Sequence, residues 1–92
     1  MAVLSENEIK EKLRDLEGWQ LKGKEISKVY KHKDFVDAIA FVNKVAILAE
    51  KADHHPDILI NYNKVTLSLS THSQGGITNN DINLAKGIDK TQ

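Results

Sequence analysis

Three of the four histidines in this sequence have a spacing that would bring them together, and imidazoles suit proton transfer near neutral pH. His54 and His55 precede a run of alternating aliphatic residues, and His72 follows a second run. If the two runs pair as a hairpin, the register places His72 opposite Asp53 and His55 opposite Ser70, with His54 alongside. Such a cluster predicts a site that can both give and take a proton.

A zinc site is the main alternative for three histidines, because zinc accepts imidazole ligands and keeps one position open for catalysis. Adjacent side chains on an extended chain point in opposite directions, which argues against one ion bound by both His54 and His55. Pro56 interrupts the strand ladder, so the sequence predicts where these side chains lie but not where they point. A His–His pair before proline can also simply end a strand, and His32, between two lysines, is predicted to lie at the surface.

The composition argues against several kinds of protein. The 92 residues carry 13 basic and 13 acidic side chains, so the formal net charge is zero. The chain therefore lacks the positive charge that would favour direct binding to nucleic acid or to an anionic membrane. The absence of cysteine removes disulfides, thiolate nucleophiles and cysteine zinc sites. The first residues predict neither a signal peptide nor a membrane span, so a cytoplasmic location is expected. A chain of this length can form one domain, residues 1–92, whose small core would gain from burial in an oligomer.

The N-terminal part is predicted to form a helix followed by a hairpin. Ser5 and Glu8 have the spacing of a capping box, and the helix that they start is expected to end at Gly18. Two short stretches rich in β-branched and aromatic residues, 19–21 and 26–32, then predict two strands.

A second helix is predicted to begin after Asp34, which can cap it. Residues Phe41, Ile47 and Leu48 lie off its main apolar stripe, so we expect them to form a second apolar surface that faces a partner subunit. The main stripe, predicted to face the core, comprises Phe35, Ala38, Val42, Val45, Ala49 and Ala52.

The second hairpin can be assigned a register from its hydrophobic pattern. A turn at Tyr62–Asn63 pairs Ile60 with Val65 and Ile58 with Leu67, which places all the aliphatic residues of the alternating pattern on one face.

A last helix is predicted to start at Thr78, with Asp81 three residues later completing a capping box. The order is therefore helix, hairpin, helix, hairpin, helix. Helices laid on one face of an antiparallel sheet define an α+β domain.

An ordered set of motifs makes the chain resemble the pterin-4a-carbinolamine dehydratases. Its spacing runs without a gap, and further matches at Gly18–Trp19 and Lys33–Phe35 extend the resemblance over nearly the whole chain. The set comprises Glu-Lys-Ala-Asp-His-His-Pro-Asp at 50–57, Tyr-Asn-Lys-Val at 62–65, Ser-Thr-His at 70–72 and Gly-Ile-Thr at 76–78, with Asp81.

The resemblance implies a four-stranded antiparallel sheet with three helices packed on one face, assembled as dimers or tetramers. It also implies the reaction, in which a 4a-hydroxytetrahydropterin loses water to give the quinonoid dihydropterin, without a metal or other cofactor. The substrate would be left by an aromatic amino acid hydroxylase, as in tetrahydrobiopterin recycling.

The family's catalytic histidines correspond to His54, His55 and His72. Dehydration needs a proton delivered to the 4a hydroxyl and one removed from the neighbouring ring nitrogen. We assign the first step to His54 and expect His72 to serve the opposite face or accept the nitrogen proton, while His55 holds the pterin. By the same resemblance, the substrate-binding residues are Asp53, Ser70, Thr71, Asp81 and Trp19.

Other functions compete with this one. Some members of the family also bind a homeodomain transcription factor through a helical surface, and the apolar surplus of the second helix would suit such a partner. Relatives in organisms without the hydroxylase would serve another pterin pathway. A metal-dependent hydrolase is the third alternative.

Overall fold

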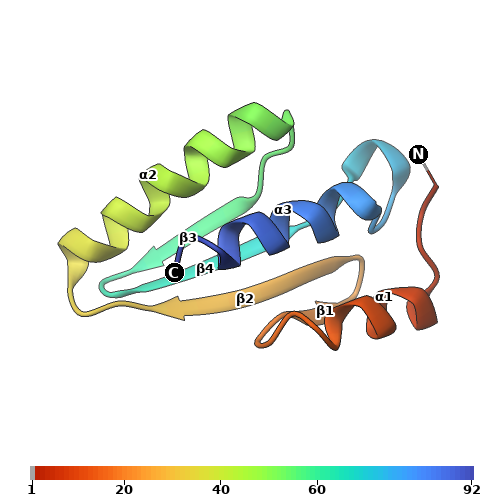
Figure 1. Ribbon diagram of the computed structural model, residues 1–92, viewed down its shortest axis with the longest axis horizontal. Coiled ribbons are helices and arrows are strands. Elements are labelled where there is room, and N and C mark those ends of the chain that lie inside the picture. The colour runs from red at the N-terminus through yellow and green to blue at the C-terminus, as the bar shows by residue number, and fades with distance from the viewer. Residues whose placement is uncertain (1) are drawn as a thin grey trace.

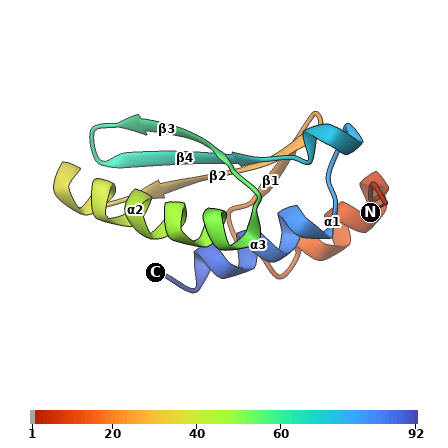
Figure 2. The same cartoon turned by 90° about the horizontal axis from the view of Figure 1, so that it is seen from above.

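Two β-hairpins form one antiparallel sheet in the structure, a computed structural model that describes residues 2–92. All four strands pair in the order β1-β2-β4-β3, and three α-helices lie on one face of the sheet (Figures 1 and 2). The fold is therefore α+β, as the sequence predicts. The elements are α1 (Glu6–Leu13), β1 (Gln20–Lys22), β2 (Glu25–Lys31), α2 (Phe35–Ala52), β3 (Asp57–Asn61), β4 (Lys64–Leu69), the 3-10 turn η1 (His72–Gln74) and α3 (Asn79–Asp89).

The predicted helix starts are confirmed by hydrogen bonds. Reciprocal capping boxes join Ser5 to Glu8 and Thr78 to Asp81, and the side chain of Asp34 accepts from the third backbone amide of α2. Each cap satisfies an amide that the first helical turn leaves without a partner.

The end predicted for the first helix is wrong. Helix α1 stops at Leu13 and does not reach Gly18, because the chain leaves the helix through a tight turn in which the Leu16 amide bonds the carbonyl of Leu13. Leu16 still reaches the core, but it does so from this turn. Gly18 then adopts a positive φ of 87°, a conformation that glycine tolerates better than other residues.

The register of the second hairpin agrees with the prediction. Ile60 pairs with Val65 and Ile58 pairs with Leu67, and both valine and leucine are fully buried beneath the helices. Ile58 keeps 39% of its surface exposed because β3 is an edge strand of the sheet. The second hairpin therefore buries its β4 side chains more completely than those of β3.

The apolar surface of α2 is divided differently from the prediction. Phe41, expected to face a partner subunit, is 3% exposed and packs against Tyr30, with ring centroids 4.6 Å apart. Leu48 packs partly against the core as well, whereas Ile47 is exposed as expected. Phe35, assigned to the core stripe, is instead 51% exposed. The helix is rotated so that its buried line runs through Ala38, Phe41, Val45 and Ala49.

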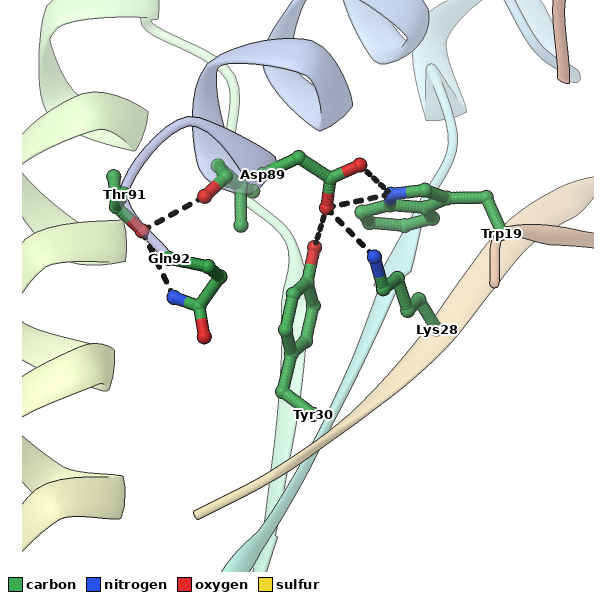
Figure 3. Close-up of polar contacts among 7 residues, drawn as sticks. Trp19, Lys28, Tyr30, Asp89, Thr91 and Gln92 are labelled. Atoms are coloured by element: carbon green, nitrogen blue, oxygen red, sulfur yellow. Dashed lines mark hydrogen bonds and ion pairs between the residues drawn. The ribbon is translucent and has the colours of Figure 1, made fainter. Parts of the chain in front are cut away.

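A carboxylate at the end of α3 ties the helix to the sheet (Figure 3). Asp89 accepts hydrogen bonds from the indole of Trp19 at 3.2 Å, from the Tyr30 hydroxyl at 2.5 Å and from the Lys28 ammonium at 2.9 Å. Burial raises the pKa of the Tyr30 hydroxyl far above its ordinary value of 10.0, and the neighbouring Asp89 raises it further. This cluster fixes the C-terminal end of α3 on the first hairpin.

Within residues 2–92, none of the helices combines the length and the apolar character needed to cross a membrane.

Candidate active site

His54 and Asp81, 27 residues apart in sequence, form a hydrogen-bonded pair between the end of α2 and the start of α3. His54 Nε2 lies 2.5 Å from Asp81 Oδ1, and the side chain of His54 is 12% exposed while that of Asp81 is fully buried. The chain is directed to this point by Asp53, which ends α2 in the left-handed conformation with φ 49°. The His54 amide also bonds the Ala49 carbonyl, so the backbone that carries the imidazole is held to the last turn of α2.

The second carboxylate oxygen of Asp81 is saturated by the loop and helix around it. Oδ2 accepts from the Thr78 backbone amide at 2.9 Å and from the Thr71 hydroxyl at 2.8 Å. Because the single hydroxyl proton of Thr71 is used in this bond, the 2.8 Å contact between the two threonine hydroxyls requires that Thr78 donates to Thr71. One buried carboxylate therefore links the end of β4, the start of α3 and His54.

This pairing determines which ring nitrogen of His54 can act on a ligand. Since Nε2 donates to the carboxylate, the neutral ring presents Nδ1 as an acceptor, and the protonated ring presents Nδ1–H as a donor. A buried carboxylate at hydrogen-bond distance fixes the tautomer of the ring and orients it. The pair can thus serve as an acid or as a base through one nitrogen.

His55 points to a different partner from its neighbour. Its Nε2 lies 2.5 Å from Glu50 Oε2 on the surface of the last turns of α2, and both side chains are largely exposed. The two adjacent histidines therefore bind two different carboxylates. His55 remains more accessible to a large ligand than His54.

His72 follows directly after Thr71, which is bonded to Asp81, so it lies one residue from the His54 network. It begins η1, is exposed, and lines a hollow of about 300 Å³ together with Ser70. The structure thus brings His54, Thr71 and Asp81 into contact, and places Ser70 and His72 next to them along the chain.

Two predicted residues lie elsewhere. Trp19 is buried against Asp89 at the opposite end of α3 from Asp81, and its predicted contact with a substrate stays a prediction. His32, predicted to lie at the surface, is partly covered and stacks on Phe41 with ring centroids 4.8 Å apart. His32 is covered because the rotation of α2 brings Phe41 inward over the end of β2.

Sequence reasoning missed two partners in this region. The sequence predicts Thr78 as a helix cap, but the Thr78 hydroxyl also donates to that of Thr71, a contact that no periodic pattern reveals. Glu50 is bonded to His55, although its position on α2 also suits a solvated helix end. In both cases the only sign in the sequence is that the residue belongs to one of the motifs of the resemblance, at 50–57 for Glu50 and at 76–78 for Thr78.

Residues 2–92 contain no group of three or more His, Cys, Asp or Glu side chains that could hold a metal ion.

Comparisons with known proteins cover nearly the entire chain. A family model described as pterin 4 alpha carbinolamine dehydratase matches residues 2–91. A relative from Roseiflexus castenholzii is 55% identical over 97% of this chain and 96% of its own length, and one from Sulfolobus acidocaldarius is 47% identical over 97% and 98%. Both are provisionally named pterin-4-alpha-carbinolamine dehydratases. A crystal structure of a transcriptional coactivator/pterin dehydratase from Brucella melitensis superposes with a TM-score of 0.92, at 42% identity and 97% coverage of each chain.

Proposed function

The chain belongs to the pterin-4a-carbinolamine dehydratase family of hydro-lyases, and we propose that His54 and His72 carry the proton transfers of this dehydration. The substrate is a 4a-hydroxytetrahydropterin. His54, as the imidazolium, gives a proton to the 4a hydroxyl, and the C4a–O bond breaks to release water. The neighbouring ring nitrogen loses its proton as the double bond forms, which yields the quinonoid dihydropterin and balances the step.

The observation that carries this proposal is the buried Asp81 carboxylate between the two histidine segments. It holds His54 through Oδ1 and holds Thr71, the residue before His72, through Oδ2. His54, oriented by the buried carboxylate, and His72, the residue after the Thr71 that the same carboxylate holds, are the two proton carriers that the reaction needs.

The remaining polar residues have supporting roles. His72 is exposed and makes no hydrogen bond through its ring within residues 2–92, so it is free to accept the nitrogen proton or to serve the opposite face of the ring. His55, held on the surface by Glu50, contacts the pterin edge. Asp53, Ser70 and Thr71 complete the binding site through backbone and side-chain groups.

An ultraviolet assay tests the activity directly. A 4a-hydroxytetrahydropterin is generated enzymatically, and its absorption is followed with and without the protein. The protein is expected to accelerate loss of the carbinolamine, and to do so after exhaustive chelation, because imidazole protons rather than a Lewis acid drive the step. Loss of activity on removal of stoichiometric zinc would contradict this mechanism.

Histidine variants test the assignment. His54→Ala and His72→Ala should each lower turnover by about 10²–10⁴-fold, the usual contribution of general acid–base catalysis. His32→Gln is the control, because His32 follows β2 at the opposite end of the β2–β4 ladder from His72. If both site variants keep turnover within threefold of the parent, with unchanged circular dichroism, these histidines do not carry the chemistry.

We also propose the setting that the resemblance implies. The product would return to tetrahydropterin in the cytoplasm, in recycling linked to an aromatic amino acid hydroxylase. Comparing the rate of an aromatic hydroxylase cycle with and without this protein tests that link, since accumulated carbinolamine should fall when the protein is present.

A protein-binding role is the second candidate, and the exposed apolar face of α2 favours it. Phe35, Val36 and Ile47 each expose more than half of their surface. Such a face is covered in solution either by another copy of the chain or by a different protein. We propose the first, a homodimer or homotetramer.

A further inference from the structure

We propose that a hollow beside His72 binds an anionic substituent of the pterin, and this inference rests on the proposed dehydratase function. The hollow measures about 300 Å³ and lies between the β1–β2 turn and the loop around η1. Figures 1 and 2 both show these two segments at the same end of the sheet, the turn in orange and the loop in pale blue. The lining residues are Lys22, Lys24, Glu25, Ser70, His72 and the Gly75–Gly76 backbone.

The register of the sheet explains why these side chains meet. Ile26 pairs with Leu69, so the next residues outward, Glu25 and Ser70, lie side by side at the end of β2 and β4. Lys22 pairs with Glu25 across the first hairpin and therefore lies on the same face. This is the face opposite the helices, because Leu69 and Ile26 point into the core.

The side chains of this hollow are rich in unused hydrogen-bond donors. Within residues 2–92, neither Lys22 nor Lys24 has a carboxylate within 4.0 Å, and the side chains of Ser70 and His72 make no hydrogen bond. The residues that carry two ammonium groups, a hydroxyl and an imidazole thus line one hollow. Glu25 is the single acidic group among them, which leaves one net positive charge when His72 is neutral.

An anion is the ligand that such a donor set recognises. Lysine ammonium groups attract phosphate or carboxylate as point charges, and a serine hydroxyl or imidazole N–H completes the oxygen contacts. The open backbone at Gly75, where an added Cβ would meet nothing within 4 Å, leaves room for the ligand to approach. Because His72 belongs both to this hollow and to the proposed proton-transfer pair, the anion must be attached to the pterin that reacts there.

Two pterins that differ only by one phosphoryl group test the inference by binding. The probes are 6-hydroxymethyl-7,8-dihydropterin and its phosphate ester, and a 6-carboxy analogue distinguishes carboxylate from phosphate. We expect the phosphate ester to bind about tenfold tighter than the alcohol at low salt, because each exposed ion pair contributes a factor of about two to five. The preference should shrink as salt is added.

Matched variants localise the effect. In Lys22→Gln/Lys24→Gln the two affinities should come within twofold, whereas Glu25→Gln should increase the phosphate preference. Lys31→Gln/Lys64→Gln is the control, because these lysines pair on the same sheet face at its other end. The control should keep the preference of the parent.

The outcomes separate this inference from the proposed function. Equal affinity for ester and alcohol in the parent protein overturns the anionic subsite, even if the carbinolamine is dehydrated. A clear phosphate preference that the control variant also loses overturns the assignment to Lys22 and Lys24. Preferential binding of the ester, with no acceleration of carbinolamine loss in the ultraviolet assay, retains the subsite and overturns the dehydratase activity.

Discussion

At the scale of single residues, two carboxylates on the same helix have different roles, one at the proposed site and one in anchoring the helix. Asp81 lies in the first turn of α3 and orients His54, while Asp89 ends α3 and anchors it to Trp19, Lys28 and Tyr30. Each accepts three or more hydrogen bonds in a covered environment. Only Asp81 touches a proposed catalytic group, so the pair offers a matched comparison between positioning and structural roles.

Asp81→Asn should lower turnover by about 10²–10⁴-fold, because an amide no longer fixes the tautomer and orientation of the His54 ring as the carboxylate does. It should also change the shape of the pH–rate profile, which a purely structural change would leave intact. Asp89→Asn should reduce stability but keep the profile of the parent. Steady-state kinetics across pH on both folded variants check this, and identical profiles in Asp81→Asn and the parent would contradict the role.

The buried Tyr30 hydroxyl predicts a loss of stability in alkali. Its pKa is raised in the folded protein, so above about pH 10 an unfolded tyrosine releases its proton while Tyr30 keeps its own. This contribution is complete below pH 10 and then falls by about 1.4 kcal/mol for each pH unit as pH rises toward the raised pKa.

Denaturant unfolding between pH 9 and 11 measures the effect. Tyr30→Phe should show a shallower alkaline fall in the free energy of unfolding than the parent. Tyr62→Phe is the control, because Tyr62 is 67% exposed in the turn between β3 and β4. Parallel curves for Tyr30→Phe and the parent would show that the hydroxyl ionises equally in both states.

At the scale of elements, the site depends on where helices begin and end. Helix α2 ends at Asp53, which turns the chain so that His54 meets α3, and α3 begins with the Thr78 cap that also supports Thr71. The capping groups thus position the proposed catalytic residues as well as stabilise the helices.

The N-cap of α2, Asp34, lies at the opposite end of the helix from His54. A substitution there therefore tests the contribution of a cap to stability without changing the proposed site. Asp34→Ala should lower the free energy of unfolding by about 1 kcal/mol, because the Asp37 amide loses its acceptor. Asp34→Asn should cost much less, since asparagine caps helices about as well as aspartate. Chemical denaturation checks the order, and an alanine variant as stable as the asparagine variant would contradict it.

At the scale of the whole molecule, the exposed face of α2 predicts self-association. Val36 is 72% exposed and lines a shallow apolar hollow of about 380 Å³ with Phe35, Ile39, Ala40 and Asn43. Leaving such a surface in water costs about 25 cal/mol for each Å², and burial between subunits removes that cost.

Val36→Glu should therefore weaken a dimer or tetramer that forms at micromolar concentration, and should leave the dehydratase site folded. Val29→Glu is the control, because Val29 is also exposed but lies on β2, on the sheet face away from the helices. Sedimentation velocity distinguishes the species. A parent protein that is monomeric at tens of micromolar would rule out this assembly.

Local chemistry explains what could be predicted from the sequence alone. The caps at Ser5, Asp34 and Thr78 depend on residues three positions apart, and the pairing of Ile60 with Val65 depends on a two-residue turn and a period of two. These interactions join residues that are only a few positions apart, so the sequence pattern can indicate them. The same reasoning placed His54 and His72 near one end of the second hairpin.

Only the tertiary structure decided which way the side chains point. The rotation of α2 follows from how Phe41 fills the space over Tyr30, and helical periodicity allowed either Phe41 or Phe35 to face the core. Likewise, the sequence offered Asp81 as a cap but could not show that Oδ1 is left for His54, because that depends on how α2 and α3 pack. Contacts between distant elements are set by packing and by the satisfaction of buried polar atoms, and these leave no periodic trace in the chain.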